Sequence, residues 1–151
     1  MNEITIRRAV PADWETVVEY NYRLAAETED TVLNRDVLAL GVQAALADES
    51  KALYFVAEAG GEIVGQAMVT FEWSDWRNGS IWWFQSVYIR ADWRRRGVFR
   101  QIYNAITQAG QAAGAVEFRL YAVATNEPAL ATYRSLGMKH TPYIVMECSG
   151  T

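Results

Sequence analysis

The sequence is poor in cysteine and histidine, and this scarcity excludes two common ways of building a site. Its 151 residues include one cysteine, Cys148, and one histidine, His140. A single cysteine cannot form an internal disulfide, and this pair alone cannot supply the four ligands of a usual zinc site. We therefore expect no metal. The apolar neighbours of Cys148, residues 144–146, predict a buried and inert thiol.

Long apolar runs and a positive net charge are also absent. No run approaches the roughly 18 to 20 residues that a membrane span needs, and residues 1–8 lack the apolar middle of a signal peptide. We therefore expect a soluble, cytoplasmic protein that does not contact a membrane. The net charge of -4 argues against a nucleic-acid-binding protein, which needs a basic face to offset phosphate charge.

Apolar and aromatic side chains, in contrast, are plentiful. Hydrophobic residues make up 51% of the chain and aromatic residues 13%, including six Trp and eight Tyr. This composition supplies a real core, and the length predicts a single domain spanning residues 1–151. The aromatic surplus predicts wide pockets or a partner surface in addition to the core.

The spacing of apolar residues predicts alternating strands and helices. We expect strands over residues 4–8, 53–58, 63–73, 80–89 and 116–123, and short closing strands over 138–140 and 143–147. We expect helices from Pro11 to about Leu24, where the acidic segment 27–31 breaks the pattern, and over about 35–47, 98–113 and 126–136. This order predicts a mixed α/β fold.

An anion site is predicted where the strand ending at Ile89 gives way to a helix. The intervening loop contains Arg94-Arg95-Arg96, and Gly97 opens the helical segment. Free N–H groups at a helix start and nearby arginines attract phosphate, and a glycine lets the backbone approach it closely. A solvated basic turn is the alternative interpretation.

A second pattern lies in the last predicted helix. Asn126, Ala129 and Tyr133 precede Leu136-Gly137, and the seven-residue spacing of Asn126 and Tyr133 places them nearly on one helix face. By itself the pattern is also compatible with a helix cap and a core tyrosine.

Together these two motifs resemble those of the GNAT superfamily of N-acetyltransferases. Residues 94–99 match the family's Arg/Gln-x-x-Gly-x-Gly/Ala loop, with Phe99 where the family has a small residue, and residues 126–133 match Asn-x-x-Ala-x-x-x-Tyr. The order of elements matches over essentially the full length. The resemblance implies a single-domain α/β GNAT fold, with a mixed, mostly antiparallel central sheet flanked by about four helices, and acetyl-CoA as cosubstrate.

The resemblance also implies roles for individual residues. The strand before the loop would hold the pantetheine arm by its backbone, the loop would bind the pyrophosphate, and Asn126 would reach the amides of the arm. Tyr133 would give a proton or a hydrogen bond to the departing thiolate. The implied acetyl-CoA residues are Val87, Tyr88, Ile89, Arg94, Arg95, Arg96, Gly97, Val98, Phe99, Arg100, Asn126, Ala129 and Tyr133.

The general base is less determined by the sequence. Many relatives carry a carboxylate on the strand before the loop, where this chain has Gln85, which cannot take a proton. Glu72 and Asp75 are the candidates, acting through water, and burial between Phe71 and Trp73 would raise the pKa of Glu72. Two alternatives remain open: Glu72 is an outward charge, or the amine loses its proton to bulk water before it binds.

The acceptor pocket is implied between the first two helices and the third and fourth strands. That region offers carboxylates and aromatic walls that suit a cationic amine: Glu29, Trp73, Asp75, Trp76 and Gln85, with Tyr20, Tyr22, Glu27, Asp30, Glu72, Trp82 and Phe84 nearby. The alternative is that the tryptophans form core and a dimer surface while the acids are solvated.

These observations predict an acetyl-CoA-dependent N-acetyltransferase for a small primary amine. The amine would attack the thioester directly in a ternary complex, with no covalent enzyme intermediate and no metal. Two rivals remain: a protein or peptide N-acetyltransferase, and a catalytically silent acyl-CoA-binding sensor. A homodimer is a further expectation.

Overall fold

The computed structural model describes residues 3–151, which divide into two compact units. The first unit ends at Tyr121 and the second comprises Ala122–Thr151. The α/β fold expected from the sequence is confirmed, whereas the extent of a single domain over residues 1–151 stays a prediction. Within the described residues, no helix combines the length and the apolar character that a membrane crossing requires.

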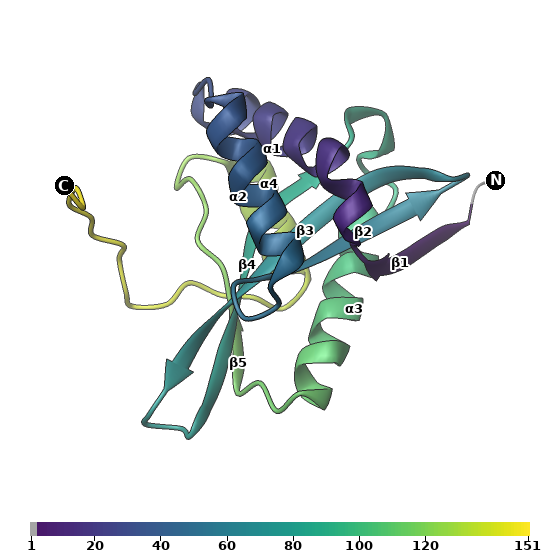
Figure 1. The fold of residues 1–151 in the computed structure, drawn as a ribbon. Helices are drawn as coiled ribbons and strands as arrows, with labels where there is room; N and C mark the ends of the chain where they lie inside the picture. Colours follow the sequence, from purple (N-terminus) through teal and green to yellow (C-terminus); the bar gives the residue numbers. More distant parts are fainter. Residues whose placement is uncertain (1–2) are drawn as a thin grey trace. The chain divides into compact units, whose positions relative to one another are not determined.

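A five-stranded sheet is the centre of the first unit (Figure 1). Its strands follow one another in chain order: β1 (Ile4–Arg8), β2 (Leu53–Ala59), β3 (Glu62–Ser74), β4 (Gly79–Ile89) and β5 (Glu117–Arg119). The first four pair antiparallel and β5 pairs parallel to β4, which confirms a mixed, mostly antiparallel sheet. Gly60 and Gly61 form the β2–β3 turn with φ of 59° and 80°, a conformation that glycine adopts without strain.

The described residues form four α-helices: α1 (Trp14–Glu29), α2 (Arg35–Ala47), α3 (Val98–Ala112) and α4 (Glu127–Ser135). Their starts follow ordinary capping, as where Asn34 accepts hydrogen bonds from the N–H groups of Asp36 and Val37. The expectation that the acidic segment breaks the first helix after Leu24 is wrong. The helix continues to Glu29 because glutamate is a good helix former, and it ends where Asp30 turns left-handed with φ of 49°.

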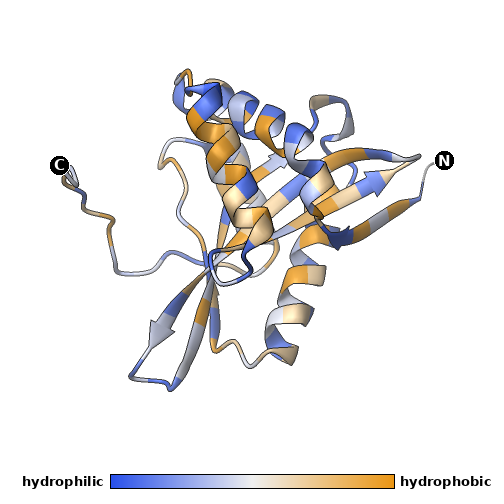
Figure 2. Cartoon of the chain, viewed as in Figure 1, coloured by the Kyte–Doolittle hydropathy of each residue, from blue (hydrophilic) through white to orange (hydrophobic). Residues whose placement is uncertain are grey.

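The helices of the first unit cover both faces of the sheet. On one face, Val17 and Val18 of α1 and Val42 of α2 form a buried cluster with Tyr54 of β2. On the other face α3 lies close to β3. A Cβ built at Gly65 of β3 would come within 2.8–3.4 Å of Ile89, Val98 and Ile102, which shows how close the helix approaches. Ile102 and Ile106 of α3 are buried, whereas α2 also exposes Val37 and Leu40, and Figure 2 shows apolar residues along much of the visible length of α2.

The strands expected near the C-terminus are wrong. β5 covers only Glu117–Arg119, although a strand was expected over residues 116–123. Residues 138–140 and 143–147 form no strand, and Cys148 is exposed instead of buried. A strand is stable only when a neighbour accepts its backbone hydrogen bonds, and alternating side chains cannot reveal whether such a neighbour exists.

Two helical glycines give a matched test of packing. A Cβ at Gly110 would lie 2.4 Å from Phe118, whereas a Cβ at Gly41 meets nothing within 4 Å. We expect Gly110→Ala to lower the free energy of unfolding by about 1–3 kcal/mol through overpacking. Gly41→Ala should instead raise it by about 0.4–1 kcal/mol. Urea denaturation of both variants checks this, and an unchanged or more stable Gly110→Ala protein contradicts the packing.

Candidate acetyl-CoA site and acceptor cavity

A bulge interrupts β4 next to its C-terminal end. Gln66 of β3 pairs with Tyr88, and Met68 pairs with Gln85, so β4 contains one extra residue in this interval. Ser86 lies in the bulge with a left-handed φ of 51°. Its carbonyl accepts a hydrogen bond of 3.1 Å from Nε2 of Gln66, whose side chain is fully buried. The bulge is therefore held by a specific side chain.

From residue 84 onward, β4 continues without β5 as a neighbour. The two strands pair only where Ile81–Trp83 lies beside Glu117–Arg119, although β4 continues to Ile89. Along residues 84–89, the edge of β4 that faced β5 therefore has no strand partner within the described part of the chain. A bound extended chain can take up backbone groups of this kind. Val87 and Ile89, predicted to hold the pantetheine arm, lie in this segment.

The arginine loop adopts the conformation expected of an anion site. Arg95 and Gly97 both have left-handed φ, 64° and 76°, and α3 begins directly afterwards at Val98. No side chain caps the first turn of α3, so its N–H groups remain available on the side where Arg95, Arg96 and Arg100 are exposed. A helix start of this kind attracts phosphate. The guanidinium of Arg96 lies 4.8 Å from the ring centre of Trp93.

Arg94 has a different position from its neighbours. Its Nη2 lies 2.7 Å from Oε1 of Glu27, and its Nε donates to the carbonyl of Ile89 at 2.9 Å. The Tyr88 hydroxyl donates to the other Glu27 oxygen at 2.6 Å. Burial of the carboxylate works against ionisation, but the hydrogen bonds from Tyr88 and Arg94 hold the pKa of Glu27 below its ordinary value. Arg94 therefore ties the loop to α1 and to the end of β4.

Phe99, the residue that departs from the family pattern, points into the core. It is buried, and its ring centre lies 6.3 Å from that of Phe84 and 6.2 Å from that of Tyr103. Its bulk is therefore accommodated in the core on the sheet side of α3.

The second motif lies in the second unit and is described within it. The Asn126 side chain caps α4 by accepting from the Ala129 N–H at 3.4 Å, and Pro128 occupies the first turn. Burial raises the pKa of the Tyr133 hydroxyl above its ordinary value. Tyr133 is therefore protonated at neutral pH, as a hydrogen-bond donor must be.

A cavity of about 360 Å³ lies between the first two helices and the sheet, beside the bulge. Its walls include Asn21, Leu38, Val42, Tyr54, Met68 and Ser86. Of the described residues that line it, Lys51 is the one with a charge, and its Nζ lies 3.0 Å from Oδ2 of Asp48. Gln85 borders this region through a 3.4 Å contact with Thr70, which also lines the cavity.

A larger cleft of about 580 Å³ lies along α1, the β2–β3 turn and Arg90. Its charges pair with one another, as where Arg7 contacts Asp13 at 2.9 Å and Glu58 at 2.7 Å. No residue of the β4 bulge lines it. The smaller cavity is therefore the one that opens beside the β4 segment that has no β5 partner.

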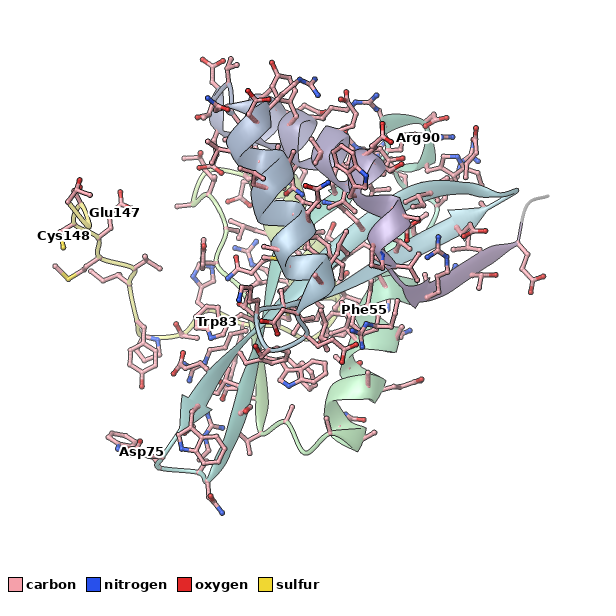
Figure 3. The ribbon with its side chains drawn as sticks, in the orientation of Figure 1. Phe55, Asp75, Trp83, Arg90, Glu147 and Cys148 are labelled. Atoms are coloured by element: carbon pink, nitrogen blue, oxygen red, sulfur yellow. The ribbon has the colours of Figure 1, made fainter. Side chains whose placement is uncertain are left out.

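The structure does not bring the predicted acceptor residues together. Trp73, Asp75 and Trp76 lie at the end of the β3–β4 hairpin, where Figure 3 labels Asp75. Glu29 lies near the opposite end of β4. Its neighbour Glu27 contacts Tyr88. Tyr88 is nine residues, and thus roughly 30 Å, along β4 from Gly79 at the hairpin turn. Trp76 is 93% exposed, and Trp82 and Phe84 belong to the core.

Glu72, the predicted base, is exposed, so the burial expected from its aromatic neighbours is wrong. Its carboxylate accepts a 3.0 Å hydrogen bond from the Trp83 indole. It pairs with Ile81, five residues and thus about 16 Å from Ser86 along the strand.

Sequence reasoning missed Gln66 and Ser86, and it listed Glu27 without its partners. The signal that could have revealed the first is its place between Val64 and Met68 on one face of the strand, where a polar side chain needs a hydrogen-bond partner. The bulge at Ser86 had no signal, because serine carries no preference for a left-handed conformation.

A three-layer α/β arrangement, with a bulged strand that has one free edge and an uncapped helix start behind an arginine loop, agrees with the acetyltransferase fold that the sequence motifs implied. The profile of the Acetyltransferase (GNAT) family matches residues 14–138, and the chain belongs to this family of N-acetyltransferases. No curated protein matches the sequence.

Solved structures agree with this membership. A possible acetyltransferase from Clostridium difficile 630 is 42% identical, with a TM-score of 0.91 and coverage of 98% of each chain. The aminoglycoside N-acetyltransferase AAC(6')-Iy in complex with CoA is 19% identical, with a TM-score of 0.79 over 100% of this chain and 97% of that one. A predicted acetyltransferase with acetyl-CoA from Clostridium acetobutylicum is 17% identical, with a TM-score of 0.80 over 97% and 96%. The last two share the fold.

Proposed function

We propose that this protein transfers the acetyl group of acetyl-CoA to a primary amine of a small molecule by direct attack in a ternary complex. The observation that carries the proposal is that three features lie next to one another: the end of β4 that has no β5 partner, the bulge at Ser86 and the cavity that Ser86 lines. A thioester held along β4 would face an amine held in that cavity.

Each motif has a role in this proposal. The pyrophosphate binds the N–H groups that start α3, with Arg95, Arg96 and Arg100 supplying charge, while Arg94 positions the loop. Val87 and Ile89 hold the arm through their backbones. Asn126 contacts its amides, and Tyr133 donates its proton to the thiolate that leaves. The structures with CoA and acetyl-CoA among those sharing the fold support acetyl-CoA as the cosubstrate.

The test is CoA-thiol release from acetyl-CoA with monoamines, polyamines, aminoglycosides, amino acids and short peptides. Release with a small amine is the expected result. Release with peptides alone would favour the protein N-acetyltransferase rival. Tight acetyl-CoA binding without release from any acceptor would favour the sensor. Cytoplasmic localisation remains part of the proposal.

We further propose that Glu72 does not act as the general base. A base must lie within hydrogen-bond reach of the amine or act through one water, and Glu72 lies about 16 Å along the strand from the bulge. Glu72→Gln is therefore expected to keep kcat/KM within about threefold of the wild-type value at pH 7 to 9. A loss of the hundredfold order typical of a missing base would restore Glu72 to that role.

A homodimer is supported by the apolar segment Tyr143–Met146, whose four side chains are 67–85% exposed. Contiguous exposed apolar residues mark protein contacts in soluble proteins. Sedimentation velocity of the full chain should show a dimer, and Ile144→Lys should shift it toward monomer. A monomer at all concentrations tested contradicts the proposal.

A further inference from the structure

The cavity beside Ser86 has a composition that selects among amines, and this inference rests on the function proposed above. Of its described lining residues, Lys51 is charged and no carboxylate is among them. The rest present apolar surface, as from Leu38, Val42 and Met68, or uncharged polar groups. A second ammonium group against these walls would lose part of its hydration without gaining a free anionic partner, because the carboxylate of Asp48 already pairs with Lys51 at 3.0 Å.

Apart from Lys51, the polar groups of the cavity are uncharged. Asn21 and Tyr54 are 8% and 6% exposed. Asn21 donates to the carbonyl of Val17 at 3.0 Å. Burial raises the pKa of the Tyr54 hydroxyl, so it stays neutral and retains its proton. Together with Ser86 they offer hydroxyl and amide groups that can hydrogen-bond an uncharged amine nitrogen.

We propose that the acceptor is a primary monoamine with an apolar body, an alkylamine or arylalkylamine, and that burial in this cavity holds its amino group uncharged. This proposal explains how the amine could lose its proton although residue 85 is a glutamine and not a carboxylate. An ammonium that enters apolar surroundings loses its proton more readily, because desolvation disfavours the charged form. The pocket composition would then do what a general base does elsewhere.

The acetyl transfer can be written with all atoms and charges balanced and without a protein base. The ammonium releases one proton to solvent as the amine settles in the cavity. The nitrogen lone pair then forms the N–C bond to the acetyl carbon, and the C–S bond breaks with its electron pair on sulfur. The sulfur takes a proton from Tyr133, and Tyr133 recovers one from the acetylated nitrogen through solvent. The products are the N-acetyl amide and CoA thiol.

The first experiment compares pentylamine with 1,5-diaminopentane, which have the same chain and differ by a terminal ammonium. We expect kcat/KM for pentylamine to exceed that for the diamine by at least tenfold, and 2-phenylethylamine to exceed kanamycin likewise. Equal values, or a preference for the diamine or kanamycin, overturn the inference and leave the acetyltransferase proposal standing. If no amine gives Tyr133-dependent release of CoA thiol, although acetyl-CoA binding is measured on the same protein, both the inference and the acetyltransferase proposal are overturned.

A substitution at Gly41 tests whether this cavity makes the selection. Gly41 lines the cavity from α2, and a Cβ there meets nothing within 4 Å, so the fold should tolerate a side chain. Gly41→Glu should reduce the preference for pentylamine over the diamine at least fivefold, whereas Gly41→Gln, equal in size and uncharged, should not. An unchanged preference in both folded variants overturns the assignment to this cavity.

The pH profile gives a readout independent of selectivity. The apparent pKa in kcat, which reports the bound complex, should lie well below the value of about 10 that is ordinary for an alkylamine. A kcat that keeps rising to about pH 10 contradicts an uncharged bound amine.

Discussion

Replacing Tyr133 by phenylalanine is expected to lower kcat for CoA release by about 100-fold or more, while the Kd for acetyl-CoA stays within about twofold. A positioned acid typically contributes a factor of 10² to 10⁴, and the hydroxyl acts only when the thiolate leaves. Because burial raises the pKa of Tyr133, the hydroxyl holds its proton throughout the neutral range. The expected loss is therefore constant from pH 6 to 9.

The control for this prediction is Tyr121→Phe. Tyr121 is 60% exposed and its ring lies beside Trp83, in the part of β4 that pairs with β5, so removal of its hydroxyl should leave both parameters unchanged. Isothermal calorimetry supplies the Kd and a thiol-detection assay supplies kcat. An equal loss of affinity and turnover in Tyr133→Phe, or no loss, would remove the assigned role.

The second large effect is expected at Gly97. Its φ of 76° is left-handed and immediately precedes the helix start proposed to bind pyrophosphate. A β-branched residue disfavours this conformation by roughly 1–2 kcal/mol, so Gly97→Val should rotate the loop and displace its N–H groups. The loss of one hydrogen bond to a charged phosphate, about 1.5–3 kcal/mol, corresponds to a Kd for CoA that rises roughly 10- to 150-fold.

Gly114 supplies the matched control. It lies beyond the other end of α3 with φ of 84°, and like Gly97 it has no atom within 4 Å of a built Cβ. Gly114→Val should therefore lower the free energy of unfolding by a similar amount and leave CoA affinity unchanged. Equal weakening of CoA binding in both variants would show that general destabilisation, and not the loop, controls affinity.

The elements with strong local signals could be predicted from the sequence. β1 and α2 have the predicted bounds. As expected, Gly60-Gly61 form the turn between β2 and β3, Asn126 caps the start of α4, and Gly137 follows its end. Glycine at positive φ and an asparagine cap act through their nearest neighbours, so their effects are visible in a few consecutive residues. The arginine loop, with Gly97 immediately before the start of α3, belongs to this class.

The acceptor residues could not be predicted in the same way. Trp73, Trp76 and Glu29 looked like one pocket because their residue types suit a cation, yet the length of β4 separates them. The cavity is instead lined by ordinary residues such as Leu38, Met68 and Ser86, whose types give no indication of a site. In our proposal, the choice of amine depends on which of these side chains meet.

The sequence alone therefore determined the family, the order of the elements as far as α4 and the arginine loop with its helix start, because these depend on residues close together along the chain. The tertiary structure decided three further points: the extra residue in β4 at Ser86, the early end of the β5 pairing, and the assignment of Arg94 to Glu27. Each arises from contacts between residues far apart in sequence, such as Gln66 with Ser86, 20 positions away. Such contacts depend on strand register and helix placement, which local residue patterns do not encode.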